Sequence, residues 1–116
     1  MDQSKALAAL QALANPQRLA LIRHLMGADG HAAGALASCL GISASALSFH
    51  LAALEAAGLI RSRREGRQVI YAADRAEMGR LIGHLLNDCC RGDAEVQACC
   101  MNGLTVPDAP FIPAAE

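Results

Sequence analysis

Aromatic residues are almost absent from this chain of 116 residues, which has no Trp, one Tyr and two Phe. Hydrophobic residues still make up 53% of the sequence, and many of them are alanine. Alanine is the strongest helix former but buries little apolar area. The composition therefore predicts one mostly helical domain, whose small core needs a second subunit.

The sequence also lacks a long apolar run. No stretch has the length or apolarity of a membrane span, and the first ten residues, MDQSKALAAL, lack the basic start and apolar run of a signal peptide. We therefore expect a cytoplasmic protein without a membrane partner. In a reducing cytosol, clustered cysteines more often bind metal or do redox chemistry than form structural disulfides.

An overall excess of positive charge is missing too, because the net charge is −1. The charges are unevenly spread. Residues 61–67, RSRREGR, contain four Arg and one Glu, a net +3, whereas residues 68–116 contain three Arg and seven acidic residues, a net −4. A concentrated basic segment indicates phosphate binding better than the total charge does.

The pattern of apolar residues predicts a helix–turn–helix followed by a hairpin. Two helices, the second starting at Asn15-Pro16, precede a short helix over about residues 33–40. The turn GIS at residues 41–43 leads into a helix over about residues 44–57, and Ser43 of this turn is placed to cap that helix. Alternating segments then flank Gly66, where glycine gives the backbone freedom that a hairpin needs. The second helix of a helix–turn–helix enters the DNA major groove, and a hairpin after it forms a wing.

A last helix, capped by Asp74, carries an apolar stripe that ends at Cys89. Beyond Gly92 no periodicity remains, and three prolines indicate an extended or disordered tail. These are Pro107, Pro110 and Pro113. The fold class is thus mainly α with a small β-hairpin, as a winged helix–turn–helix domain over residues 1–92 and a cysteine-containing, proline-rich tail over residues 93–116.

The helix over residues 44–57 has one face suited to DNA. Three leucines should pack inward, and Ser45, Ser48 and Phe49 fall on the opposite face. Small hydroxyls there can approach base edges or phosphates, and the Phe ring can meet a thymine methyl. An exposed helix face without a function is the alternative.

The hairpin arginines could contact phosphates or the minor groove. They could also form a solvated strand edge that blocks pairing with other chains. Because side chains alternate along a strand, Arg61 and Arg63 point one way and Arg64 the other. Not all of them can touch DNA at once.

The chain resembles the ArsR/SmtB family of metal-responsive winged-helix repressors over roughly residues 5–92. The resemblance rests on the runs ALANPQRLALIRHL and LGISASALSFHLAALEAAGLIRSRREGRQVIYAA. These contain the motifs L-x-x-P-x-R-L, S-x-H-L, A-G-L and E-G-R-x-x-x-Y. The resemblance implies a homodimer formed by the first and last helices. This dimer would read a palindromic DNA operator and lose affinity for DNA when a metal or metalloid binds.

The resemblance also implies that Ser48 and His50 of S-x-H-L contact DNA, although His50 could equally pack between helices. The expected DNA-binding residues are Ser43, Ser45, Ser48, Phe49, His50, Arg61, Arg63, Arg64, Arg67 and Gln68.

Two of the family's sensing positions do not carry their usual ligands here. The third helix has Ala32 and Gly34 where members have a C-x-C pair, and Cys39, out of that register, is expected to be a small buried core residue. In the last helix, where zinc sensors use Asp, His and Glu, Asp74 remains but Ala76, Asn87 and Cys90 occupy the other positions.

The segment DCCRGDAEVQACC, residues 88–100, resembles a third arrangement found in arsenic-responsive members. Its cysteines are Cys89, Cys90, Cys99 and Cys100. Trivalent arsenic and antimony are soft and take three thiolates. Adjacent cysteines on a regular helix point about 100° apart, so both can bind one ion only if the helix end unwinds, which Gly92 allows. The loop after it would return Cys99 or Cys100 to the ion, with As(III) or Sb(III) as the inducer and no organic cofactor.

Other functions for these thiols remain open. They could hold structural zinc, respond to zinc, cadmium or lead, or form disulfides as a redox switch. Cys89 could simply belong to the dimer seam. Four cysteines also leave open which three bind, and whether two of them bind a monomethylated arsenical. A small thiol oxidoreductase is least supported, because no C-x-x-C sits at a strand-to-helix turn and no nucleophile has a positioned base, so we expect no enzyme.

Overall fold

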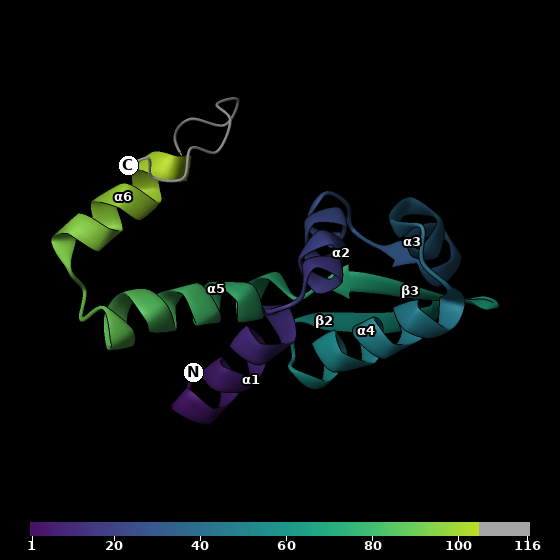
Figure 1. Cartoon of the computed structure of the whole chain (residues 1–116), viewed down its shortest axis with the longest axis horizontal. Helices are drawn as coiled ribbons and strands as arrows, with labels where there is room; N and C mark the ends of the chain where they lie inside the picture. The colour runs from purple at the N-terminus through teal and green to yellow at the C-terminus, as the bar shows by residue number, and fades with distance from the viewer. Residues whose placement is uncertain (105–116) are drawn as a thin grey trace. The chain divides into compact units, whose positions relative to one another are not determined.

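The computed structural model describes residues 1–104, with the side chains of residues 1–102 (Figure 1). It contains two compact units, Met1–Leu81 and Ile82–Glu116, which are described separately. The first unit contains, in chain order, α1 (Gln3–Leu13), α2 (Pro16–Met26), β1 (His31–Ala32), α3 (Ala33–Leu40), α4 (Ala44–Ala56), β2 (Ile60–Glu65), β3 (Gln68–Ala73) and most of α5 (Arg75–His84). The second contains the end of α5, a π-helical turn (Leu85–Cys89) and α6 (Ala94–Leu104). The expected mainly helical chain with a small β-hairpin is confirmed.

Side-chain caps fix where the helices of the first unit begin. Pro16 is the first residue of α2, and Asn15 Oδ1 accepts hydrogen bonds from the backbone N–H groups of Gln17 at 2.9 Å and Arg18 at 3.1 Å. An N-cap oxygen of this kind satisfies donors that have no partner within the helix. The N-terminal end of α2, and with it the position of Arg18, is therefore set by local chemistry.

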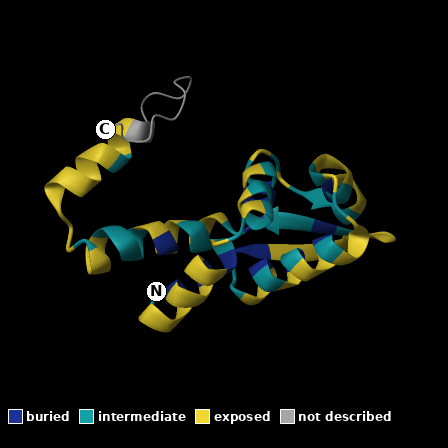
Figure 2. Ribbon diagram, in the orientation of Figure 1, coloured by how far each residue is buried: buried dark blue, intermediate teal, exposed yellow. Residues whose placement is uncertain are grey.

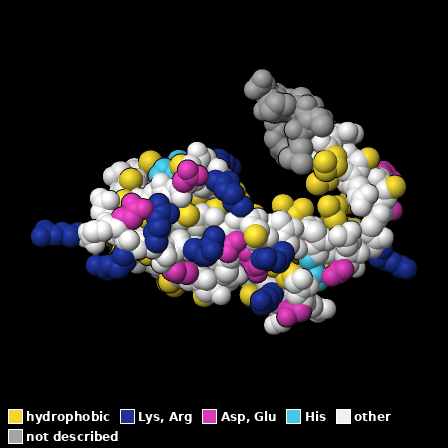
Figure 3. All heavy atoms as spheres, turned by 180° about the vertical axis from the view of Figure 1, so that it is seen from behind, with side chains coloured by type: hydrophobic (Ala, Val, Ile, Leu, Met, Phe, Trp, Pro, Cys, Tyr) yellow, Lys and Arg dark blue, Asp and Glu magenta, His cyan; other side chains and the backbone are white. Residues whose placement is uncertain are grey.

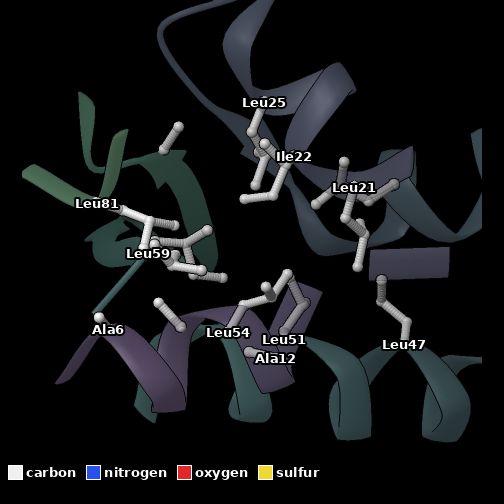
Figure 4. Close-up of a cluster of buried hydrophobic side chains, with 14 residues drawn as sticks. Ala6, Ala12, Leu21, Ile22, Leu25, Leu47, Leu51, Leu54, Leu59 and Leu81 are labelled. Atoms are coloured by element: carbon white, nitrogen blue, oxygen red, sulfur yellow. The ribbon is translucent and has the colours of Figure 1, made fainter. Parts of the chain in front are cut away.

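The core of the first unit lies mainly between α2 and α4. Figure 4 shows their leucines pointing toward one another, and Leu21, Leu25 and Leu54 are fully buried. The helix α1 covers this core with small side chains, namely Ala6, Ala9 and Ala12. Two of its leucines, Leu7 and Leu10, are 51% and 39% exposed. The single chain therefore leaves an apolar face of α1 uncovered.

The hairpin supplies two strands, β2 and β3, of a three-stranded antiparallel sheet with the order β1-β3-β2. Its register runs from Ile60 opposite Ala73 to Glu65 opposite Gln68. Gly66, the first of the two loop residues, has φ 63°, a left-handed conformation that costs glycine no strain. The strand β1 was not predicted, because two residues are too few to show an alternating pattern.

The helix that begins after Asp74 changes its geometry before it ends. Asp74 Oδ1 accepts the N–H of Glu77 at 3.0 Å, which confirms the expected cap. Regular α-helix ends at His84, and the backbone continues as the π-helical turn Leu85–Cys89. Such turns are rare and occur often at functional sites.

A helix also follows where the sequence predicted no regular element. The Asp93 carboxylate accepts the N–H groups of Glu95 and Val96, both at 3.1 Å, and α6 begins at Ala94. The expectation of an irregular chain beyond Gly92 is therefore wrong, because Asp93 is a good N-cap and Glu95 suits a first turn. Nearly all described residues of α6 are exposed (Figure 2). The tail prolines Pro107, Pro110 and Pro113 lie outside the described residues.

Within the described chain, no single helix is long and apolar enough to cross a membrane. Only α3 and α4 counted together reach that length and composition, and they bend by 110° relative to each other. Their buried leucines, Leu36, Leu47, Leu51 and Leu54, belong to the core of the first unit.

Candidate nucleic-acid interface and cysteine pairs

The helices α3 and α4, with the turn between them, have the geometry of a helix–turn–helix. Gly41, with φ 65°, ends α3, and its N–H donates to the Ala37 carbonyl at 2.9 Å. Ser43 Oγ then accepts the N–H of Ala46 at 3.1 Å and starts α4. The bend of 110° between the two helices lies within the range of about 90–120° of this motif. With the hairpin after α4, the expected winged helix–turn–helix is present.

The helix α4 has one buried face and one exposed face. The buried residues are Leu47, Leu51 and Leu54. On the other side, Ser45 and Ser48 are exposed and Phe49 is 66% exposed. Short hydroxyl side chains beside an accessible aromatic ring can come close to base edges and to a thymine methyl group. The structure thus brings three of the predicted DNA-binding residues together on one face.

His50 lies half-buried beside this face and contacts a residue that sequence reasoning missed. The Arg18 Nε–H donates to His50 Nδ1 at 3.1 Å, and the Arg18 guanidinium carbon lies 5.5 Å from the centroid of the Phe49 ring. Arg18 is the arginine of the L-x-x-P-x-R-L motif. That motif was a signal for it, but 32 positions separate the two hydrogen-bonded residues and no local pattern links them.

The first wing strand is joined to α4 on one side only. Ser62 Oγ donates to Glu55 Oε2 at 2.9 Å, so Ser62 faces α4. Arg61 and Arg63, which alternate with it, line an open hollow of about 320 Å³ that Ala28, Asp29 and Arg75 also line. Arg61 and Arg63 thus line one hollow together, as the alternation predicts, and the side on which Arg64 lies stays a prediction.

The hairpin arginines differ in their partners. Arg61 Nε lies 3.5 Å from an Asp74 carboxylate oxygen, and Arg63 Nε lies 2.7 Å from a Glu65 carboxylate oxygen. Arg64 and Arg67 form no ion pair with any described residue, and together with Gln68 they are exposed. Figure 3 shows basic side chains projecting at the wing end of the first unit, and basic and acidic side chains mixed along the rest of its visible face. The tip is thus the part of the wing with unneutralised positive charge.

The two C-terminal cysteine pairs lie at different places in the second unit. Cys89 ends the π-helical turn, and the Cys90 N–H donates to the Leu85 carbonyl at 2.8 Å. The chain then turns through Arg91 and Gly92, both left-handed with φ 57° and 66°. The backbone therefore leaves α-helical geometry already at Leu85, and the unwinding that ion binding would need at this pair stays a prediction.

The second pair, Cys99 and Cys100, lies within α6 rather than on the predicted loop. Only the turn over residues 90–93 separates the two helical segments. All four C-terminal thiols are free, with Cys89 and Cys99 exposed and the other two intermediate. The four cysteines are therefore accessible soft donors on two consecutive helical segments.

Among the described residues, no three His, Cys, Asp or Glu side chains lie close enough together to hold a metal ion. The cysteines suit a soft ion by donor type, but a three-thiolate site would require the turn at residues 90–93 or the start of α6 to move. Cys39 is exposed on α3, whose single buried residue is Leu36. The expectation of a buried Cys39 is wrong, because a helix this short has few inward positions.

Comparison with known proteins gives a consistent result. A helix-turn-helix domain family matches residues 13–63. The HTH-type transcriptional regulator YgaV of Escherichia coli is 37% identical over 86 residues, which cover 74% of this chain and 87% of YgaV. The transcriptional activator HlyU of Vibrio cholerae is 37% identical over 81 residues, which cover 70% of this chain and 74% of HlyU.

Solved structures resemble the chain as well. An ArsR-like transcriptional regulator from Rhodococcus sp. RHA1 superimposes with a TM-score of 0.71 at 29% identity, covering 83% of this chain and 90% of that one. Reduced HlyU gives a TM-score of 0.61 at 37% identity, covering 72% and 87%. The homodimeric winged helix-turn-helix DNA-binding domain of Mb0332 from Mycobacterium bovis gives 0.61 at 26% identity, covering 78% and 86%.

Proposed function

Because this chain belongs to the ArsR-like family of winged helix-turn-helix transcriptional regulators, we propose that it is a DNA-binding repressor released from its operator by trivalent arsenic or antimony. The chain is a transcriptional regulator, as its relatives are, and it is not an enzyme. The inducer and the direction of regulation are the proposed part. The single observation that carries them is the pair of free vicinal cysteines at a helix end that has already left α-helical geometry.

Operator binding is proposed to use the exposed face of α4 and the tip of the wing. Ser45, Ser48 and Phe49 would enter the major groove, and Arg64 and Arg67 would contact phosphates or the minor groove. Arg61 and Arg63 already have acidic partners and face away from α4, so we expect them to contribute less.

A homodimer is proposed to form through α1 and α5. The exposed leucines Leu7 and Leu10 on α1 and the 46% exposed Ile82 on α5 give each helix uncovered apolar surface. Burying such surface stabilises an interface, and the Mb0332 domain is named as homodimeric. Two recognition helices related by a two-fold axis would read two half-sites of a palindrome about one DNA turn apart.

The sensing site is proposed to take three thiolates from Cys89, Cys90, Cys99 and Cys100. Soft trivalent arsenic and antimony prefer thiolates, whereas usual zinc sites space their cysteines two to four residues apart. Binding would fix the geometry where α5 ends, and α5 is also the proposed dimer helix. The dimer would then favour a spacing of the recognition helices that fits the operator poorly. A coupling of about 1–3 kcal/mol would weaken DNA binding by about 5- to 150-fold.

A thiol-redox switch is the second candidate. All four C-terminal cysteines are free and accessible, and one of the similar solved structures is that of reduced HlyU. Oxidation would link the same residues that we assign to the metalloid. A zinc-, cadmium- or lead-responsive repressor would use them too, with four thiolates in place of three.

Operator release tests these alternatives directly. A labelled duplex, selected by the wild-type protein from a random library, is followed by fluorescence anisotropy during titration with arsenite, antimonite, zinc, cadmium or diamide. We expect arsenite and antimonite to raise the Kd for the duplex by about 5- to 150-fold. If arsenite leaves the Kd unchanged while zinc or diamide abolishes binding, the metalloid proposal is wrong and the corresponding alternative replaces it.

A further inference from the structure

We propose that Arg18, on α2, is a positioning residue that sets how His50 and Phe49 of α4 meet DNA, an inference that rests on the DNA-binding function proposed above. Arg18 would act through these two side chains and would not contact DNA itself. Its role would be to determine the selectivity of base reading rather than the general affinity for DNA.

The starting point of the Arg18 side chain is fixed. Its backbone N–H bonds to the Asn15 cap at 3.1 Å, on the first turn of α2. Its Nη1 donates to the Ala12 carbonyl at 3.5 Å, and the residue is half-buried. Arg18 therefore reaches α4 from a helix end that is capped locally by Asn15.

The hydrogen bond to His50 determines the tautomer of that ring. A guanidinium has donors only, so Arg18 Nε–H donates and His50 Nδ1 accepts, at 3.1 Å. The neutral ring must then carry its proton on Nε2. No described residue accepts a hydrogen bond from that nitrogen. His50 therefore offers one N–H donor, which suits a phosphate oxygen or a base acceptor such as guanine N7 or O6, adenine N7 or thymine O4.

The same guanidinium supports the Phe49 ring. Its Cζ lies 5.5 Å from the Phe49 centroid, a cation–π distance, and the Phe49 and His50 rings meet edge to face at 5.6 Å and 66°. Phe49 is 66% exposed, and these two contacts lie on the side of its ring that faces Arg18 and His50. One side chain on α2 thus orients a donor and an apolar ring that are neighbours on α4.

This role differs measurably from a phosphate contact. Losing a phosphate contact weakens binding to all sequences about equally and lowers the slope of log Kd against log salt concentration by about one. Losing a positioning residue weakens binding to the preferred sequence and leaves the slope unchanged. The Arg18 guanidinium is already engaged by His50, Phe49 and the Ala12 carbonyl, which favours the second behaviour.

The test compares Arg18→Met and Arg18→Lys with Arg23→Met, an exposed arginine on the same helix. Anisotropy is measured with the duplex selected by the wild type and with a scrambled duplex of equal length, at several salt concentrations. We expect Arg18→Met to lose about tenfold affinity for the selected duplex and to stay within about twofold for the scrambled one, with an unchanged salt slope. Arg18→Lys keeps the charge but not the planar fork, so it should not restore selectivity, and Arg23→Met should behave as wild type.

Equal losses on both duplexes, a lower salt slope, or full rescue by Arg18→Lys would overturn the proposal in favour of a phosphate contact. An unchanged affinity of Arg18→Met for the selected duplex would overturn the role of Arg18 alone. If the wild type selects no sequence at all, the function proposed above fails and the role of Arg18 in DNA reading fails with it.

A second measurement separates positioning from folding. Long-range proton–nitrogen NMR correlations of the His50 ring should show Nδ1 unprotonated in the wild type and a mixture of tautomers in Arg18→Met. Circular dichroism checks that both proteins are folded. A wild-type ring protonated on Nδ1, or an unchanged tautomer in a folded Arg18→Met, would overturn the assignment.

Discussion

Ser62 Oγ donates to Glu55 Oε2 at 2.9 Å, and this bond joins the first strand of the wing to the helix that we propose to read DNA. It lies on the α4 side of β2, opposite the face on which Arg61 and Arg63 have acidic partners. The orientation of the wing relative to α4 therefore depends in part on one exposed contact. Proteins with two DNA-contacting elements need such contacts, because each element must reach its groove at the same time.

Removing this bond should weaken operator binding without unfolding the protein. We expect Ser62→Ala and Glu55→Ala each to raise the Kd by about threefold, because a hydrogen bond to a charged group contributes modestly when exposed. The double variant should bind the operator no more weakly than either single variant. A double-mutant cycle detects this non-additivity, which is expected when two residues act through one contact. Strictly additive losses would mean that the bond does not couple the wing to α4.

The arginines of the hairpin should differ in their salt dependence. Arg64→Ala or Arg67→Ala should lower the slope of log Kd against log salt concentration by about one, because each would remove a phosphate contact. Arg61→Ala is the matched control, since Arg61 pairs with Asp74 and faces the other side of the strand. A reduced slope in Arg61→Ala with no change in Arg64→Ala and Arg67→Ala would reverse our assignment of the DNA-facing side.

Two leucines on α2 provide a test of the core. Leu21 is fully buried and Leu19 is 50% exposed. Leu21→Ala should lower the free energy of unfolding by about 2–5 kcal/mol, because it removes buried methyl groups and leaves a cavity. Leu19→Ala should change it by less than about 0.5 kcal/mol. Urea unfolding at one fixed protein concentration measures both, and similar losses for the two variants would contradict the described packing.

Single cysteine replacements should identify the thiolates that bind the metalloid. Trivalent arsenic takes three thiolates, so we expect three of the four serine variants at Cys89, Cys90, Cys99 and Cys100 to lose release by arsenite and one to keep it. Cys39→Ser is the control and should respond as the wild type does, since Cys39 lies on α3 in the other unit. Retention of release in all four variants would contradict a three-thiolate site.

Elements that depend on local chemistry could be predicted from the sequence. Asn15-Pro16 starts α2, Ser43 caps α4 and Gly66 closes the hairpin, and each signal acts within a few residues of itself. The inward leucines of α4 followed from helical periodicity for the same reason.

Features that depend on residues distant in the sequence could not be predicted in this way. The Arg18–His50 bond joins residues 32 positions apart, so the sequence alone left His50 between DNA contact and helix packing. The helix α6 was missed because it buries no apolar stripe in the described structure, although Asp93 marked its start. The exposed Cys39 was misjudged because residue type does not reveal which face of a short helix is covered.

Release of preformed operator complex by arsenite tests the central claim most directly. The wild type is compared with a variant carrying serine at Cys89, Cys90, Cys99 and Cys100 and retaining Cys39, with the same selected duplex and the same reductant. We predict that both proteins bind the duplex with similar Kd in the absence of arsenite, and that arsenite releases only the wild type. Release of the serine variant at the same arsenite concentration, or no release of the wild type, would contradict the account.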